Sequence, residues 1–190
     1  KAIMTSADHE RASDRVSEAM VKIEKEKGYK TDIIILYQGD EPMVTPEMID
    51  LSINKMLADN NVEVINLMSE INSEIEFKDP NEVKVVVDNN NDAIYFSREP
   101  IPSTKKYSEQ IKKYKQVCVI PFRRNSLIEF NNTQQTYLEE IESIDMLRII
   151  QIGKKVRMVN IDKHVFSVDT PSDLKKVEDL MTNDKLIKLY

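Results

Sequence analysis

Apolar positions along the chain follow helical spacing in some stretches and strand spacing in others. Across residues 13–27 they recur at the i, i+3, i+4, i+7 spacing of an amphipathic helix. We expect Ser13 or Asp14 to cap this helix and Gly28 to follow its end. Residues 33–37 form a short, continuous apolar run, which predicts a strand buried on both faces of a parallel sheet.

The rest of the pattern continues this alternation of strands and helices. Thr45 and Thr170 each precede a proline, the arrangement that opens a helix. The turn at 89–92 predicts a β-hairpin with a longer loop. The segments together predict one α/β domain over residues 1–190, with a mixed sheet flanked by helices and a β-hairpin insertion. The expected strands cover 62–68, 83–87, 93–97, 117–122 and 156–159, and the expected helices cover 45–59, 138–153 and the chain from 170, with a loop and a short helix in 99–115.

Composition narrows the possible functions. The formal net charge of −6 argues against a broad nucleic-acid surface, so we expect no nucleic-acid partner. The single cysteine, Cys118, allows neither an internal disulfide nor a cysteine-based zinc site. Only three glycines occur, which excludes glycine-rich phosphate loops and the GxGxxG dinucleotide motif. No apolar run is long enough to cross a membrane, and we therefore expect a cytoplasmic protein with no membrane partner.

Two acidic loops carry the candidate chemistry. Residues 38–42 and 166–171 each place an aspartate, Asp40 or Asp169, after a strand and shortly before a helix. Ligands of open α/β sheets bind outside the carboxyl ends of strands, and paired carboxylates there suit Mg²⁺. The spacing therefore predicts that the two carboxyl groups lie close together and share a metal cluster. The alternative is that both aspartates only support the N-termini of the helices that follow.

Several segments, in order along nearly the whole chain, resemble the family of 3-deoxy-manno-octulosonate cytidylyltransferases, also called CMP-Kdo synthetases. Any one of these motifs alone is weak, and their order makes the resemblance specific. The segments are MTSADH (4–9) with SDR (13–15), QGDEP (38–42), DPNEVKVV (79–86), IYFSR (94–98) with PIP (100–102), LE (138–139), LR (147–148) and VDTPSDL (168–174).

The resemblance implies a nucleotide-diphospho-sugar transferase-like fold and a Mg²⁺-dependent reaction. The family joins CTP to a 3-deoxy-2-ulosonic acid such as Kdo, giving a CMP-sugar and pyrophosphate for lipopolysaccharide or other surface polysaccharide. The anomeric hydroxyl attacks the α-phosphate, a reaction that needs charge neutralisation and in-line positioning. The family also forms homodimers through its hairpin and C-terminal helices, so we expect a homodimer here.

On the nucleotide side, the resemblance assigns roles to four residues. Asp40 and Asp169 match the catalytic, metal-binding acids, which would hold Mg²⁺ on the triphosphate and near the attacking oxygen. Asp14 and Arg15 match a segment that lines the nucleotide pocket. Arg15 also lies on a predicted helix face, where a solvated side chain is the ordinary state.

On the sugar side, Arg98 matches a residue that binds the sugar carboxylate, and Gln38 one near the sugar. A surface ion pair is the alternative role for Arg98. The chain departs from the family where Gln116 replaces a histidine and Asp145 with Met146 replaces Glu-Gln. These positions belong to the substrate pocket, so the acceptor is expected to be another ulosonate or a substituted Kdo.

Other polar residues have ordinary interpretations. We expect Lys84, inside an apolar strand, to extend its ammonium group to the surface, and the lysines of residues 105–115 to form a solvated face. His164 and Cys118 are read as structural.

The family's basic, phosphate-binding segment after the first strand does not occur in this sequence, which begins at Lys1. We therefore expect an N-terminal piece of the domain to be missing, the alternatives being a processed tag or a renumbered chain. Without that segment, the 190 residues alone are expected to show little or no turnover. Two other functions stay open: a glycosyltransferase of related fold, and a non-catalytic nucleotide-binding homologue or fragment.

Overall fold

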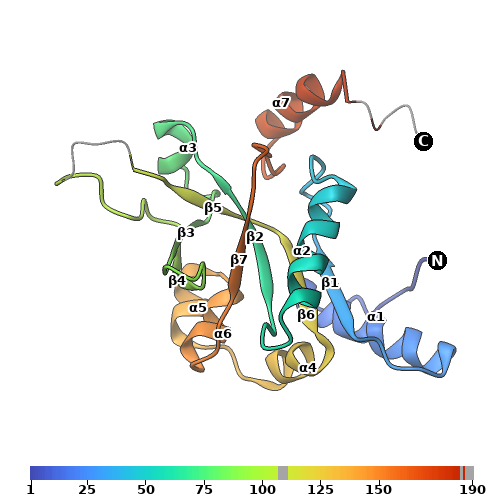
Figure 1. Ribbon diagram of the computed structural model, residues 1–190. Coiled ribbons are helices and arrows are strands. Elements are labelled where there is room, and N and C mark those ends of the chain that lie inside the picture. Colours follow the sequence, from blue (N-terminus) through green and yellow to red (C-terminus); the bar gives the residue numbers. More distant parts are fainter. Residues whose placement is uncertain (107–110, 185, 187–190) are drawn as a thin grey trace.

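The computed structural model describes residues 1–106, 111–184 and 186 (Figure 1). Helices and strands alternate up to β3, four strands and then three helices follow one another, and β7 and α7 end the order. The helices are α1 (Ala12–Lys27), α2 (Pro46–Ala58), α3 (Glu74–Lys78), α4 (Arg124–Asn132), α5 (Tyr137–Glu142), α6 (Met146–Gln151) and α7 (Pro171–Met181). The strands are β1 (Ile33–Tyr37), β2 (Ile65–Glu70), β3 (Lys84–Val87), β4 (Ala93–Ser97), β5 (Tyr114–Val117), β6 (Val119–Arg123) and β7 (Arg157–Ile161).

Five of these strands form one mixed sheet in the order β4-β3-β5-β2-β7. Strands β2 and β7 pair in parallel, whereas the other neighbours in this sheet pair antiparallel. Helix α6 packs against β4, and α2 packs against β2 and β7 (Figure 1). The predicted fold, a mixed sheet flanked by helices with a hairpin formed by β3 and β4, is confirmed.

Strand β1 was predicted in a parallel sheet, and this prediction is wrong. It pairs antiparallel with β6 in a separate two-stranded sheet. The run is apolar on both faces because two different core clusters lie against it. Ile34 and Leu36 belong to one cluster, while Ile33 and Ile35 pack against the other. A continuous apolar run thus reports burial on two sides and does not report the direction of the neighbouring strand.

The predicted strand 117–122 is two strands separated by Cys118, where the chain passes from the five-stranded sheet into the two-stranded one. Side chains and a loop satisfy the backbone at this break. The Cys118 N–H donates to Glu41 Oε1 at 2.6 Å, and the Cys118 carbonyl accepts from the Gln38 N–H at 3.2 Å. The Val117 carbonyl accepts from Asn66 Nδ2 at 2.7 Å. The break therefore anchors the Gln38–Glu41 loop to the sheet.

Several helix boundaries also differ from the predictions. Residue Arg11, and neither Ser13 nor Asp14, is the N-cap of α1, because the helix starts one residue earlier than Ser13. Gly28 follows the end of α1, as predicted, and adopts the left-handed conformation with φ 73°. The predicted helix 138–153 is divided into α5 and α6 by Ser143, whose φ is 54°. Helices α3 and α4 were not predicted.

Two lysines expected at the surface are buried. The fully buried Lys84 ends at the carbonyls of Asp79 and Glu82, at 2.8 and 2.6 Å from its Nζ. The equally buried Lys115 lies 2.7 Å from Glu76 Oε1 and 2.9 Å from Glu82 Oε1. Both ammonium groups remain inside because oxygen atoms surround them, which compensates for the loss of water.

The lysine-rich segment 99–115 contains no helix in its described parts, 99–106 and 111–115. Strand β5 already begins at Tyr114. Residues 107–110, where part of the predicted short helix falls, lie outside the described residues.

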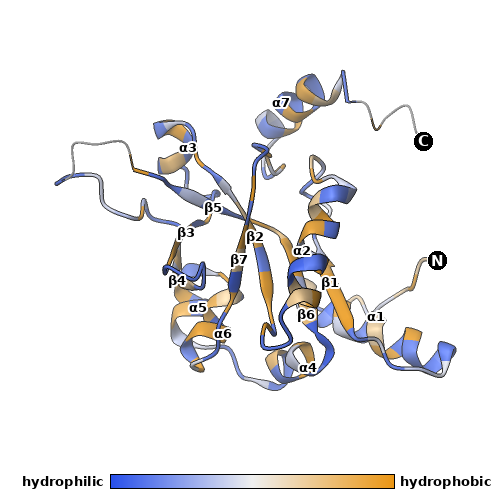
Figure 2. Cartoon of the chain, in the orientation of Figure 1, coloured by the Kyte–Doolittle hydropathy of each residue, from blue (hydrophilic) through white to orange (hydrophobic). Residues whose placement is uncertain are grey.

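Buried apolar side chains form two clusters around the sheets. Figure 2 shows the hydrophobic segments along β1, β2 and β6 and on the helices. The larger cluster joins helices α1, α4 and α6 to the sheets, and the smaller one lies under α2. Within the described residues, no helix has both the length and the apolar character that a membrane crossing requires. Members of the larger cluster include Met20, Leu36, Phe96, Phe122, Phe130 and Leu147, and members of the smaller one include Met48, Met56, Leu67, Val117 and Val165.

Candidate active site

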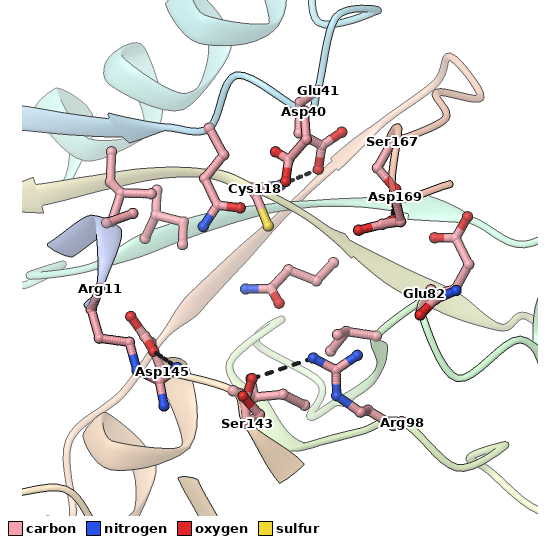
Figure 3. A pocket seen from close by; sticks show the side chains of 18 of the residues that line it. Arg11, Asp40, Glu41, Glu82, Arg98, Cys118, Ser143, Asp145, Ser167 and Asp169 are labelled. Atoms are coloured by element: carbon pink, nitrogen blue, oxygen red, sulfur yellow. Dashed lines mark hydrogen bonds and ion pairs between the residues drawn. The ribbon is translucent and has the colours of Figure 1, made fainter. Parts of the chain in front are cut away.

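A cavity of about 310 Å³ opens where the loops after β1 and near α7 meet the β5–β6 break and the N-termini of α1 and α6 (Figure 3). Most of the predicted site residues line it. Asp14 and Arg15 are not among its lining residues, and the Arg15 guanidinium instead donates to Thr5 Oγ1 at 2.6 Å and to the Ser6 carbonyl at 3.0 Å. The predicted residues that line the cavity are Gln38, Asp40, Arg98, Gln116, Asp145 and Asp169.

Asp40 and Asp169 lie on two loops that are hydrogen-bonded to each other. The Val168 N–H donates to the Asp40 carbonyl at 2.8 Å, and both aspartates line the cavity. The fold thus brings the two loops together, while the shared metal cluster stays a prediction. Burial is the largest cause that raises the pKa of Asp40, and the negative charge of Asp169 raises this pKa further. The ionised pair is therefore an unfavourable arrangement in the protein alone.

The carboxylate of Asp40 fits a bound cation. Its Oδ1 is buried and has no hydrogen-bond partner among the described residues. Asp169 Oδ2 accepts from Ser167 Oγ at 2.9 Å, which orients that carboxylate beside the cavity. No group of three or more acidic, histidine or cysteine side chains in the described chain could hold a metal ion. A hard cation here would thus need oxygen atoms from water or a bound phosphate as well.

Next to Asp40, the buried Glu41 fixes the loop. Its carboxylate accepts the Cys118 N–H, and its carbonyl accepts from Tyr37 Oη at 2.9 Å. Burial raises the pKa of Glu41 to about 7. The sequence shows Glu41 only as part of the QGDEP motif, because its backbone partner, Cys118 at the break between β5 and β6, lies 77 residues away.

Arg98 projects into the cavity from the end of β4 (Figure 3). Its Nε donates to the Glu142 carbonyl at 2.7 Å, and its Nη1 donates to the Pro80 carbonyl at 2.9 Å. Within the described residues no carboxylate forms an ion pair with this guanidinium, so the alternative of a surface ion pair has no support there. Carbonyl groups hold the side chain in place and leave its positive charge available to an anionic ligand.

Asp145 lines the cavity from the N-terminus of α6. Arg11 Nη1 donates to Asp145 Oδ1 at 2.8 Å, and Ser13 Oγ donates to Oδ2 at 3.3 Å. Burial raises the pKa of Asp145, while the charge of Arg11 acts against this increase. The position of α6 depends on a buried ion pair, in which Arg148 Nε donates to Glu139 Oε2 at 2.7 Å.

Gln116 lines the cavity from β5, one residue before the last residue of that strand. Its Nε2 donates to Oδ1 of the fully buried Asn66 at 2.5 Å. The sequence analysis did not single out Asn66. An asparagine in an apolar strand was the available hint, since a buried amide needs partners.

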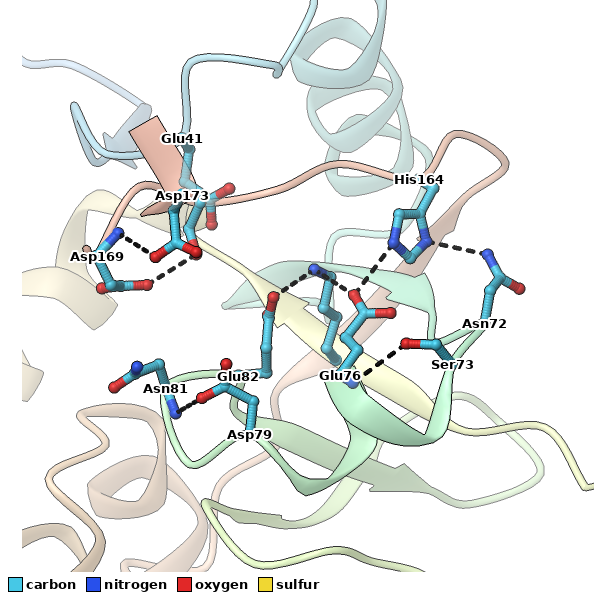
Figure 4. A network of polar contacts seen from close by, with 12 residues as sticks. Glu41, Asn72, Ser73, Glu76, Asp79, Asn81, Glu82, His164, Asp169 and Asp173 are labelled. Atoms are coloured by element: carbon cyan, nitrogen blue, oxygen red, sulfur yellow. Dashed lines mark hydrogen bonds and ion pairs between the residues drawn. The ribbon is translucent and has the colours of Figure 1, made fainter. Parts of the chain in front are cut away.

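A second polar network borders the acidic side of the site (Figure 4). Lys115 pairs with Glu76 and Glu82, and His164 Nε2 lies 3.1 Å from Glu76 Oε1. Of these residues, Glu76, Glu82 and His164 line a neighbouring cavity of about 500 Å³, which Asp169 also lines. The ion pairs join α3 and β5 to the segment that leads to Asp169, which agrees with the structural role predicted for His164.

Residues 1–156 match the family model described as cytidylyltransferase. This defines the class of protein, an α/β enzyme family that acts on a cytidine nucleotide. The chain is also 39% identical over 184 residues to the 3-deoxy-manno-octulosonate cytidylyltransferase of Geobacter metallireducens, covering 92% of this chain and 70% of that relative. The corresponding protein of Trichlorobacter lovleyi is 36% identical over 191 residues, covering 95% of this chain and 73% of the relative.

Among solved structures, this chain is similar to a CMP:2-keto-3-deoxy-manno-octonic acid synthetase complexed with CTP. The TM-score is 0.84 at 38% identity, and the match covers 95% of this chain and 72% of that one. The chain belongs to the 3-deoxy-manno-octulosonate cytidylyltransferase family. The resemblance stated from its motifs is confirmed.

Proposed function

We propose that this protein transfers CMP from CTP to a Kdo-like 3-deoxy-2-ulosonic acid and releases pyrophosphate. The product would serve lipopolysaccharide or other surface polysaccharide synthesis. The observation that carries the proposal is one cavity with two acids, Asp40 and Asp169, and an arginine, Arg98, whose charge no carboxylate neutralises within the described residues. Family membership and the relative complexed with CTP support the nucleotide assignment.

The residues on the sugar side bind and orient the acceptor. Arg98 binds the sugar carboxylate through the N–H groups that its carbonyl partners leave available. Gln38, Gln116 and Asp145 contact the remaining polar groups of the sugar. The anomeric hydroxyl releases its proton to water and its oxygen forms a bond to the α-phosphorus, while the bond from this phosphorus to the pyrophosphate oxygen breaks. Such a reaction depends mainly on positioning and charge stabilisation.

On the nucleotide side, Asp40 and Asp169 are the residues that would hold Mg²⁺. When bound, the ion would neutralise charge on the triphosphate and on the attacking oxygen. The buried, unpartnered Oδ1 of Asp40 supports this assignment. Asp14 and Arg15 are proposed to act on the nucleotide from outside the cavity, where Arg15 holds the segment containing Thr5 and Ser6.

We also propose a homodimer and a cytoplasmic location. Strand β4 is an edge of the five-stranded sheet and exposes Ile94, and the nearby α5 exposes Tyr137 and Ile141. This edge is hydrogen-bonded at Ala93 to the Val156 carbonyl, and the rest of the edge beside exposed apolar side chains suits a partner copy. The location follows from the need for CTP. The mass measured by light scattering at micromolar concentration would be twice the chain mass if the dimer forms.

The test is pyrophosphate release from CTP by the whole protein that contains this sequence, with and without Kdo and Mg²⁺. We expect release only when all three are present, together with CMP-Kdo in equal amount. A glycosyltransferase would consume a nucleotide sugar and would not release pyrophosphate from CTP. A non-catalytic homologue would bind CTP without any release.

The variant Arg98→Lys is the matched test of the sugar side. It keeps the positive charge and loses the planar set of donors. We expect it to raise KM for the sugar acid by roughly 10-fold or more, the loss of about one good hydrogen bond, with KM for CTP unchanged. Equal changes in both KM values would argue against carboxylate binding by Arg98.

A further inference from the structure

Asn66 is a fully buried amide in β2, an interior strand of the five-stranded sheet. Its Nδ2 donates to two backbone carbonyls, that of Leu67 at 2.9 Å and that of Val117 at 2.7 Å. Carbonyl groups only accept hydrogen bonds, so the amide nitrogen must be on this side. The Oδ1 of Asn66 consequently has one possible orientation, toward β5.

This orientation determines the orientation of Gln116. Met68 is the direct partner of Gln116 in the β2–β5 ladder, so Asn66 is its diagonal neighbour on the same face. Because Asn66 presents only an acceptor, Gln116 must approach it with Nε2, and the two atoms lie 2.5 Å apart. The planar amide of Gln116 then directs Oε1 away from Asn66. Within the described part of the chain, Gln116 Oε1 accepts no hydrogen bond, although the residue lines the active-site cavity.

We infer that Asn66 fixes Gln116 as a hydrogen-bond acceptor inside the cavity, and that Gln116 Oε1 recognises a donor group of the sugar acid. The donor is a hydroxyl or an ammonium group, and never the carboxylate, which only accepts. The substrate part of this inference rests on the proposed function. Asn66 is a positioning residue, since it acts on the substrate only through Gln116.

The inference also determines how the sugar acid lies in the cavity. Arg98 can only donate hydrogen bonds, whereas the oriented Gln116 presents an oxygen that accepts one. The two residues therefore bind different groups of the sugar acid. A sugar turned the other way would place its carboxylate against the Gln116 oxygen and leave the Arg98 charge unpaired. Such mismatches of buried polar groups discriminate strongly between ligands.

The kinetic test uses Gln116→Met, which keeps the chain length and removes the amide oxygen. We expect KM for the sugar acid to rise roughly 10-fold, as for one lost hydrogen bond, with KM for CTP unchanged. A series of monodeoxy Kdo analogues identifies the donor. For one analogue, KM with the unmodified protein should be higher than that of Kdo by the same factor. Gln116→Met should not raise the KM of this analogue further. The matching amino analogue should keep its KM with the unmodified protein, because an ammonium group still donates.

The variant Asn66→Ser tests the positioning role. It removes the amide that orients Gln116, and it should reproduce the change in sugar KM while KM for CTP stays unchanged. Since Asn66 also satisfies the Val117 carbonyl, the melting temperature is measured alongside. If Gln116→Met leaves the sugar KM unchanged for every analogue, the inference is wrong, whatever Asn66→Ser does to stability.

A measurement without substrate separates this inference from the proposed function. In NMR spectra of the protein alone, the Gln116 side-chain amide protons should exchange slowly with water, and Asn66→Ser should make this exchange fast. Fast exchange in the unmodified protein overturns the inference even when turnover with Kdo is high. Slow exchange without turnover on any ulosonic acid supports the orientation of Gln116 and overturns the proposed function together with the substrate assignment.

Discussion

The two walls of the cavity differ in how far the protein alone completes them. On the polar wall, formed by Arg98, Gln116 and Asp145, each side chain is held by protein partners. On the acidic wall, formed by Asp40 and Asp169, two carboxylates face one cavity and Asp40 Oδ1 has no partner in the described residues. The polar wall is therefore organised before substrate binds, whereas the acidic wall requires positive charge from a ligand.

The largest expected effect concerns the support of the polar wall. Arg148→Met breaks the buried pair with Glu139 and leaves the Glu139 carboxylate, which is 0% exposed, without its partner. We expect unfolding free energy to fall by about 3–5 kcal/mol, the usual result of breaking a buried ion pair. Urea denaturation measures the change. The double variant Arg148→Met with Glu139→Met is the control and should regain much of the loss, because it leaves no unpaired charge.

On the acidic wall, a substitution should lower turnover and leave stability unchanged. Asp40→Asn is expected to lower turnover by roughly 10²–10³-fold, the effect of losing one important electrostatic group. The folded protein should not lose stability, because burial raises the pKa of Asp40 and the ionised form is already disfavoured. Turnover and the melting temperature are measured on the same samples. Asp162→Asn, at an exposed position, is the matched control. A large drop in melting temperature for Asp40→Asn would show that Asp40 has a structural role.

Glu41, next to Asp40 on the acidic wall, should make the stability of the protein depend on pH. Its pKa in the folded protein is raised from 4.5 to about 7, so the folded state keeps a proton that the unfolded state releases. Stability from this group is therefore greatest below pH 4.5 and falls as the pH rises through about 7. The neighbouring charges are those of Lys115, Asp40 and Glu82. Burial has the largest effect of all.

The variant Glu41→Gln should remove this dependence. As the pH rises from 4.5 to 8, the unfolding free energy of the variant should increase relative to that of the unmodified protein. The total increase should be up to about 3 kcal/mol, at about 1.36 kcal/mol per pKa unit. Denaturation curves at several pH values test this, with Glu140→Gln on the exposed side of α5 as the control. A difference that is constant with pH would contradict the assignment.

The smallest effect is expected far from both walls. Glu24 accepts from Arg124 Nε and Nη2 at 2.7 and 2.8 Å, and also from Thr31. These contacts, Arg124 first, lower the pKa of Glu24 to about 2. The stabilisation is present above pH 4.5 and is lost as the pH falls through about 2. Glu24→Gln should therefore melt slightly lower at neutral pH, and the two melting curves should converge in strong acid.

Much of the acidic wall could be predicted from sequence, because its signals are local. Asp40 and Asp169 each follow an apolar strand and precede a helix opened by proline, and α2 and α7 begin where the threonine-proline pairs predict. The hairpin of β3 and β4 was likewise readable from its turn. In each case, a few consecutive residues contain the whole signal.

The supports of both walls could not be predicted, because their partners are distant in the chain. Asn66 meets Gln116 fifty residues further on, and Glu41 meets the backbone of Cys118. The contact of Ser13 is of the same kind, since its hydroxyl donates to Asp145, 132 residues away. The hydrogen-bond partners of a polar side chain depend on the tertiary fold, and local propensity does not determine them.

The most direct test of the difference between the walls is the position of a bound cation in solution. Mn²⁺ in place of Mg²⁺, added with CTP, broadens the NMR signals of nearby residues. We predict the strongest broadening at residues 38–42 and 166–171, and its loss in Asp40→Asn. Broadening that is strongest around Arg98 and Asp145, or that persists unchanged in Asp40→Asn, would contradict the assignment of the cation to the acidic wall.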